Sequence, residues 1–187
     1  MQRQPNSRND EFQTSTLCYI EQMYRLAFAR LGNAEDARDV VQDTYLKAFR
    51  SFESLHDRAH IKNWLTQILL NNIRDHYRKR SRSVDSVELL ETMDDTLQSF
   101  SIPGPEEVLS STELDPQLLQ ALHAIPDQFV VPLLLREIYD ATYEEIAHVL
   151  DIPKGTVMSR LFRARTMLRK LLLSDDGLSE HGVGVHK

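Results

Sequence analysis

Apolar side chains recur every three to four residues along most of the chain, and no stretch of any length alternates apolar and polar residues as a strand does. In the N-terminal half this pattern predicts a helix over about residues 16–31. Gly32 is placed to end it, because glycine adopts the left-handed conformation without a Cβ clash. Asn33 can then cap a second helix. The apolar face of that helix carries Ala37, Val41, Tyr45, Ala48 and Phe52.

A polar loop, residues 54–60, leads to a third predicted helix over about residues 61–80. The next helical pattern stops before Pro126, and it carries Leu118, Leu119, Leu122 and Ile125. Asp127 can cap the following helix, whose internal Pro132 should bend or open its early turns.

Two short helices end the pattern. Thr142 and Glu145 form a capping box ahead of the first of them. Asp151 and Ile152 then make a tight turn, and Pro153 can take the first position of a last helix that runs to about residue 173. Two helices around so short a turn predict a helix-turn-helix.

These patterns together predict an all-α fold with two small helical domains, residues 16–83 and 113–173. Residues 84–112, with Pro and Gly among many acidic side chains, are expected to form a flexible acidic linker. Residues 1–15 and 174–187 are expected to be a disordered N-terminal tail and a frayed C-terminal tail.

The net charge of −6 argues against a nucleic-acid partner, but the charges are unevenly distributed. Residues 84–116 hold acidic side chains and no Lys or Arg: Asp85, Glu88, Glu91, Asp94, Asp95, Glu106, Glu107, Glu113 and Asp115. Residues 154–170 hold basic side chains and no acid: Lys154, Arg160, Arg163, Arg165, Arg169 and Lys170. A second basic run, residues 74–82, has Asp75 as its only acid. Two basic segments flank an acidic one, so nucleic acid stays open as a partner.

Several classes of protein are disfavoured. No apolar run approaches the ~18–20 residues that span a membrane, and the first fifteen residues lack the apolar core of a secretory signal. We therefore expect a cytoplasmic protein without membrane insertion. The single cysteine, Cys18, offers no disulfide and no metal-ligand spacing, and we expect it to be a small buried side chain. No motif pairs a nucleophile with a base, so we expect no cofactor and no enzymatic activity.

The segment DIPKGTVMSRLFRAR, residues 151–165, contains Lys, Gly and Thr in a row. A phosphate-binding loop needs two glycines flanking four residues, followed by Lys and Ser or Thr, after a buried strand. Here there is one glycine, and a capped helix precedes it, so the segment is not a nucleotide loop.

The last helix has two faces. An apolar stripe carries Val157, Leu161, Ala164, Leu168 and Leu172, and the opposite arc carries Ser159, Phe162, Arg163, Thr166 and Lys170. Such a helix in a helix-turn-helix can enter the major groove. Arg163 can then reach guanine edges, whereas Lys154, Arg160 and Arg165 suit phosphates, with Thr156 beside them. The alternative is a solvated basic face.

Two more polar surfaces are candidates for binding. On the third helix, one arc carries Trp64, Gln67, Asn71, Arg74, Asp75 and Arg78 and leads into the basic run 78–82. An aromatic side chain with amides and arginines suits single-stranded bases and backbone, although Trp64 taken alone is more typical of core packing. On the second helix, Asp36, Asp39 and Asp43 share a face, which suits a protein partner or a solvated surface better than a metal.

With these surfaces placed, the chain resembles an extracytoplasmic-function sigma factor, a bacterial RNA polymerase specificity subunit. The resemblance rests on three segments in order: GNAEDARDVVQDTYLKAF, IKNWLTQILLNNIRDHYRKR, and LHAIPDQFVVPLLLREIYDATYEEIAHVLDIPKGTVMSRLFRARTMLRKLL. They look like the family's polymerase-binding segment, its minus-10 helix and its minus-35 module. GTVMSR together with NWLTQILLNN is most similar to the redox-stress branch, whose anti-sigma partners bind zinc.

The resemblance implies three sets of binding residues and three partners. Core RNA polymerase would be bound by Asp36, Asp39, Gln42 and Asp43. The melted minus-10 strand of promoter DNA would be bound by Trp64, Asn71, Asp75, Arg78, Lys79 and Arg80, with a flipped base in the 54–60 loop. The minus-35 element would be bound by Lys154, Thr156, Ser159, Arg160, Phe162 and Arg163. The third partner would be an anti-sigma factor.

Three positions depart from the family pattern. Asp151 stands where Gly is common, Met158 where a basic residue is common, and Thr66–Gln67 where Tyr-Arg is common. Asp tolerates the left-handed conformation, so the turn is expected to survive. Two alternatives remain at this point: a helix-turn-helix regulator that acts without polymerase, and an adaptor that binds protein through its N-terminal helices.

Overall fold

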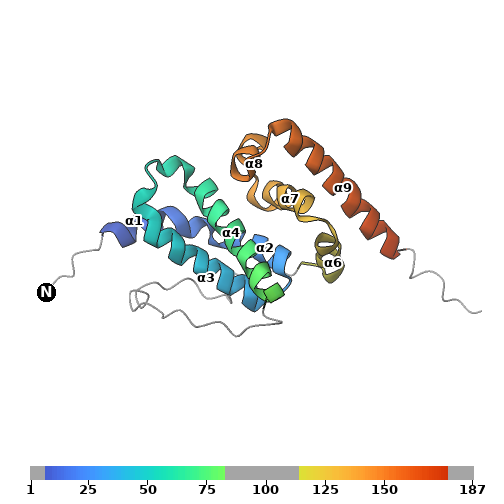
Figure 1. The fold of residues 1–187 in the computed structure, drawn as a ribbon, viewed down its shortest axis with the longest axis horizontal. Helices are drawn as coiled ribbons and strands as arrows, with labels where there is room; N and C mark the ends of the chain where they lie inside the picture. The colour runs from blue at the N-terminus through green and yellow to red at the C-terminus, as the bar shows by residue number, and fades with distance from the viewer. Residues whose placement is uncertain (1–6, 83–113, 177–187) are drawn as a thin grey trace, which may run out of the picture. The chain divides into compact units, whose positions relative to one another are not determined.

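The computed structural model describes residues 7–82 and 114–176, and every regular element in these ranges is a helix (Figure 1). The predicted all-α fold is therefore confirmed for the described residues. The chain divides into two compact units, residues 1–113 and 114–187, and each is described by itself. The predicted linker lies outside the described residues, as do residues 177–187 of the predicted C-terminal tail.

The described part of the first unit consists of α-helices and short 3-10 turns. They are α1 (Ser7–Thr16), η1 (Leu17–Tyr19), α2 (Ile20–Leu31), α3 (Ala34–Ser51), η2 (Phe52–Ser54), η3 (Arg58–His60) and α4 (Ile61–Arg82). Helices α2, α3 and α4 pack against one another. All five residues predicted for the apolar face of α3 are buried, and so are Leu65, Leu69 and Ile73 of α4. Because each large apolar side chain contributes about 1.5–3 kcal/mol on burial, this packing holds the unit together.

The N-terminal tail, residues 1–15, is predicted from the sequence to be disordered, and helix α1 corrects this prediction for residues 7–15. Its one apolar residue, Phe12, is fully buried. The Phe12 ring makes edge contacts with three aromatic rings, Tyr45, Phe49 and Phe52, at centroid separations of 6.0, 5.3 and 5.1 Å. One aromatic residue among nine polar ones gives no helical period, so only the tertiary contact reveals this helix.

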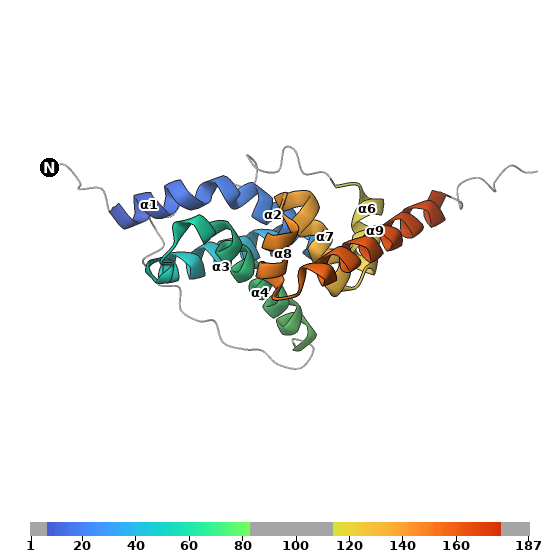
Figure 2. The same cartoon turned by 90° about the horizontal axis from the view of Figure 1, so that it is seen from above.

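The predicted helix over residues 16–31 begins with the 3-10 turn η1 and becomes α-helical at Ile20. Figure 2 shows α1 and α2 following one another on either side of this turn. Cys18 lies in η1 and is exposed, which corrects the expectation of a buried side chain. The tighter turn shifts the side chains of η1 relative to an α-helical projection. Thr16, just before the turn, is buried, and its carbonyl accepts a hydrogen bond from the Tyr45 hydroxyl at 2.7 Å.

The boundary between α2 and α3 is as predicted. Gly32 ends α2 with φ 68°, in the left-handed region that favours glycine. The Asn33 side chain accepts hydrogen bonds from the amides of Glu35 and Asp36 at 2.8 and 3.0 Å, which caps α3. Gly32 and Asn33 therefore determine where α3 begins, and with it where the acidic residues of α3 lie.

The described part of the second unit has four helices. They are α6 (Pro116–Ala124), α7 (Asp127–Tyr139), α8 (Tyr143–Leu150) and α9 (Lys154–Asp176). Helices α6, α7 and α8 all pack on α9, where Val157, Leu161 and Ala164 are buried. In both views the last turns of α9 extend past α6 (Figures 1 and 2). Within the described residues, no helix is both long and apolar enough to cross a bilayer.

Two predicted helix starts in this unit, the Asp127 cap and Pro153 as the first helical residue, are wrong by one position. Pro126, not Asp127, is the N-cap of α7, and its carbonyl accepts the amides of Phe129 and Val130 at 2.9 and 3.1 Å. Pro153 likewise precedes the first helical residue of α9, Lys154, and its carbonyl accepts two amides of the first turn. Proline lacks an N–H but keeps its carbonyl, so it can cap a helix without a side-chain acceptor. Pro132 lies buried inside α7, which the structure assigns as one helix.

Candidate nucleic-acid interface

The turn between α8 and α9 is built by local interactions. The Thr142 hydroxyl accepts the Glu145 amide at 3.2 Å, and the Glu145 carboxylate accepts the Thr142 amide at 2.6 Å, which confirms the capping box. Asp151 ends α8 at φ 51°, as expected for a residue that stands in a glycine position. The Ile152 amide then bonds the Ala147 carbonyl at 3.0 Å. These bonds fix the direction in which α9 leaves the turn.

The exposed face of α9 contains the residues predicted to read bases. Ser159, Phe162 and Arg163 are exposed, while the apolar stripe on the other side begins with buried Val157. Phe162 is 72% exposed and Met158, one turn earlier, is 54% exposed. Such exposure of two large apolar side chains on one helix face is costly in water, so the face suits a partner that covers it. The guanidinium of Arg163 lies 6.0 Å from the centre of the Phe129 ring.

The residues predicted to contact phosphate lie on the first turns of the same helix. Lys154 is exposed and forms a hydrogen-bonded ion pair with Glu144 of α8. The hydrogen bond from Lys154 lowers the pKa of the Glu144 carboxyl. Thr156 and Arg160 are half-buried, and the Thr156 carbonyl accepts the Ser159 hydroxyl at 3.0 Å. The structure thus brings all six predicted minus-35 residues together at the start of α9.

Four of the predicted minus-10 residues, Trp64, Asn71, Asp75 and Arg78, recur at helical spacing along one side of α4, whereas Arg80 lies 3.6 Å from the Asp36 carboxylate of α3. Asn71, Arg78, Lys79 and Arg80 are exposed, and Trp64 and Asp75 are half-buried, so Trp64 is not a core residue. Asp75 accepts a hydrogen bond from Arg78 at 2.9 Å, and Asn71 accepts one from Arg74 at 3.0 Å. These contacts between residues one turn apart leave a surface of cations and amides along the helix.

The acidic residues of α3 do not form one uniform surface. Asp39, Gln42 and Asp43 are exposed, but the Asp36 side chain is only 28% exposed. Its carboxylate lies 3.5 Å from Nε2 of His76 and 3.6 Å from a guanidinium nitrogen of Arg80, both on α4. Asp36 therefore faces a neighbouring helix, unlike the other three residues predicted to bind polymerase.

A polar contact, buried at Thr44 and Asn72 and exposed at Lys47, also joins α3 to α4. The Lys47 ammonium donates to the Asn72 side-chain oxygen at 2.5 Å, and the Asn72 amide donates to the Thr44 hydroxyl at 2.9 Å. Because buried polar groups are costly when they are unpaired, these bonds fix the rotation of α4 against α3. That rotation decides which side chains of α4 face outward.

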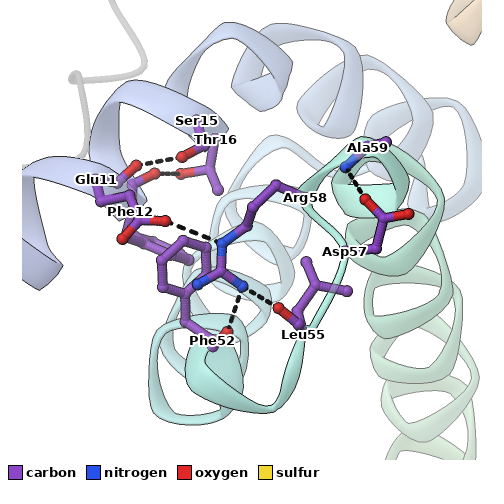
Figure 3. Close-up of polar contacts among 9 residues, drawn as sticks. All are labelled: Glu11, Phe12, Ser15, Thr16, Phe52, Leu55, Asp57, Arg58 and Ala59. Carbon is purple, nitrogen blue, oxygen red and sulfur yellow. Dashed lines mark hydrogen bonds and ion pairs between the residues drawn. The ribbon is translucent and has the colours of Figure 1, made fainter.

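The loop between α3 and α4 is held by one side chain that sequence reasoning missed. Arg58 donates from Nε to the Glu11 carboxylate at 3.0 Å and from Nη1 to the Phe52 carbonyl at 2.9 Å and to the Leu55 carbonyl (Figure 3). Its guanidinium carbon lies 3.8 Å from the centre of the Phe52 ring. His76 was missed as well, and neither residue belongs to a local motif that a sequence pattern reveals.

Comparison with protein families matches both units. The model of sigma-70 region 2 matches residues 17–83, and that of sigma-70 region 4 matches residues 117–168. The ECF RNA polymerase sigma-E factor of Haemophilus influenzae is 32% identical over 143 residues, which are 74% of this chain and 76% of that protein. The sigma-E factor of Escherichia coli K12 is 33% identical over 135 residues, 70% of each.

Solved structures show the same fold. The sigma factor RpoE, solved in complex with the anti-sigma factor NepR from Bartonella quintana, matches with a TM-score of 0.68 at 27% identity, covering 89% of this chain and 99% of that one. CnrH, in complex with the cytosolic domain of CnrY, matches with a TM-score of 0.60 at 22% identity, covering 91% of this chain and 92% of that one. Two family regions in the same order, relatives at least 32% identical that match over 70–76% of their length, and a shared fold lead to one conclusion: this chain belongs to the family of extracytoplasmic-function sigma factors of RNA polymerase.

Proposed function

We propose that this sigma factor binds core RNA polymerase through the exposed acidic side of α3 and directs it to one class of promoters. Asp39, Gln42 and Asp43 are exposed on neighbouring turns, with half-buried Leu46 and exposed Arg50 further along the same side of α3. Such a surface suits a basic partner, for which charge complementarity gives specificity and fast association. The partner, in this proposal, is the clamp of the polymerase.

The minus-10 strand is assigned to α4 and to the loop before it. Arg78, Lys79 and Arg80 supply three exposed cations for a phosphate backbone, and Trp64 presents part of its ring for base stacking. The loop residues Ser54, His56, Asp57 and His60 are exposed at the start of the same helix. They would hold the base that leaves the stack.

The minus-35 element is assigned to α9, and the exposed face of this helix is the observation that carries the proposal. Arg163 and Ser159 supply hydrogen-bond donors for base edges. Phe162, 72% exposed, supplies apolar surface for a thymine methyl group. Phe162 and Met158 are neighbours one turn apart, and an exposed pair of large apolar side chains is typical of a binding surface.

Control by an anti-sigma factor is part of the proposal. It is supported by the RpoE structure, in which a 27% identical relative is bound to the anti-sigma factor NepR. The zinc-binding type of anti-sigma factor stays a prediction that rests on the resemblance to the redox-stress branch. Because polymerase and chromosome share the bacterial cytoplasm, the proposal also places the chain there. It assigns no catalytic residue to this chain.

Transcription from purified components tests the proposal. Core polymerase plus this chain should produce transcripts that start at defined sites. Arg163→Ala should shift them to sites that no longer share the upstream motif, whereas Arg25→Ala, which replaces a half-buried arginine on α2, should leave the sites unchanged. The chain alone should bind duplex promoter DNA weakly. Tight operator binding by a dimer of the chain, with no effect on the start sites of core polymerase, would instead support a regulator that acts without polymerase.

A further inference from the structure

The 54–60 loop is tied to the body of its unit mainly through Arg58. Its guanidinium spans two backbone carbonyls, those of Phe52 and Leu55, and stacks on the Phe52 ring (Figure 3). The Nε side of the same group reaches Glu11 on α1 at 3.0 Å. One side chain therefore joins the end of α3, the middle of the loop and α1.

Several other bonds of the loop join residues close in sequence. Asp57 accepts the Ala59 amide at 2.9 Å and lies 3.4 Å from Nε2 of His60, and the Ser54 hydroxyl donates to the Ser51 carbonyl at 2.6 Å. These bonds shape single turns but do not anchor the loop to α1. His56, Asp57 and His60 are exposed, so burial of the outward-facing side chains does not order the loop either.

Helix α1 completes the anchor. Besides the buried Phe12 ring, Arg8 donates to the Phe49 carbonyl at 2.9 Å and lies 3.3 Å from the Glu53 carboxylate. Glu11 is thus presented to Arg58 by a helix that is itself bound to the end of α3. A charge-assisted bond to a fixed partner is stronger and more directional than a neutral one.

We propose that Arg58 is the positioning residue of the minus-10 site, which holds the 54–60 loop in the shape that captures one unstacked base. The proposal rests on the proposed function of the loop. A loop that is already ordered binds the minus-10 DNA strand without losing conformational entropy on binding. The bonds of Arg58 therefore increase the affinity for DNA although Arg58 itself need not contact it. Helix α1 becomes part of the promoter-melting apparatus through Glu11.

A double-mutant cycle, in which protein variants are combined with altered DNA strands, tests this assignment. Holoenzyme is formed with core polymerase, and its promoter is taken from the mapped start sites of its own transcripts. Single-stranded minus-10 oligonucleotides carry an abasic site at each position in turn, and affinity is measured by fluorescence anisotropy. The position at which base removal weakens wild-type binding most marks the captured base.

Arg58→Ala should weaken binding of the intact oligonucleotide about ten-fold, because it removes several charge-assisted bonds. On DNA that is abasic at the captured position, the same variant should bind as well as wild type. Arg58→Lys should not rescue binding, because an ammonium cannot span both carbonyls and Glu11. Glu11→Ala, which removes only the ion pair, should show the same pattern with a loss of about two- to three-fold. Arg25→Ala, whose partner Glu21 lies on its own helix, is the matched control.

Two results would overturn the assignment: an Arg58→Ala variant that binds like wild type, or one that loses equal affinity on intact DNA and on every abasic DNA. The emission of Trp64 and the melting temperature establish that each variant is folded. If Arg58→Ala does not fold, the Glu11→Ala cycle decides in its place. If the wild-type holoenzyme itself shows no preference for any minus-10 base, the proposed function fails first, and this assignment fails with it.

Discussion

Replacing Phe12 by Ala tests whether α1 is an integral part of the first unit. Phe12 is fully buried and contacts three aromatic rings, so its removal leaves a cavity beside Tyr45, Phe49 and Phe52. Truncations of buried Phe typically cost about 3–5 kcal/mol, and each lost edge contact adds to the area term. We therefore expect a loss of at least about 3 kcal/mol in the free energy of unfolding.

The chain carries a probe for this measurement. Its one tryptophan, Trp64, lies on α4 in the first unit, so its fluorescence reports unfolding of that unit. With a urea dependence of about 1–3 kcal/mol per molar, the midpoint of the Trp64 transition should fall by roughly 1–3 M. Phe162→Ala makes the same chemical change at an exposed position of the other unit and should leave this midpoint unchanged. Ordinary surface substitutions change the free energy of unfolding by less than about 0.5 kcal/mol. If Phe12→Ala lowers that free energy by no more than this, α1 is not an integral part of the unit.

Three further predictions follow from the site. Asp36→Asn should weaken binding of core polymerase less than Asp39→Asn or Asp43→Asn in a titration of labelled core, because Asp36 is occupied by His76 and Arg80. Glu144→Gln removes the partner of Lys154, so that Lys154 can contact a phosphate. Anisotropy titrations should then show tighter binding to a minus-35 duplex, and the slope of log K against log salt concentration should steepen by about 1. The hydrogen bond from Lys154 lowers the pKa of Glu144 below its unperturbed value of 4.5. The ion pair therefore stabilises the second unit above pH 4.5, and this stabilisation is lost as the pH falls through the lowered pKa. The melting temperature of wild type should therefore drop further than that of Glu144→Gln on acidification.

The parts of the fold that follow from local chemistry could be predicted from the sequence. Gly32 and Asn33 act through their own backbone and side chain, and the capping box of Thr142 and Glu145 closes within four residues. The two faces of α9 follow from helical geometry alone. For the same reason, the residues predicted for the minus-35 element do lie together on one helix start.

The parts that depend on contacts between distant residues could not be predicted. Helix α1 is stabilised by Phe12 against residues more than thirty positions away, and nothing in its own sequence shows a helical period. In the sequence, Arg58 is one polar residue in a polar loop, and its contact with Glu11 is seen only in the folded structure. Asp36 lies on the predicted face of α3, but His76 and Arg80 of α4 change what it is free to bind.

Mapping the 5′ ends of transcripts tests the central claim most directly. Fragmented bacterial DNA is transcribed by core polymerase with and without this chain, and the start sites are sequenced. We expect a new set of start sites that share two upstream motifs at a fixed separation. Phe162→Ala and Arg163→Ala should relax only the upstream motif, and Arg58→Ala only the downstream one. Start sites that are the same with and without the chain would contradict the account.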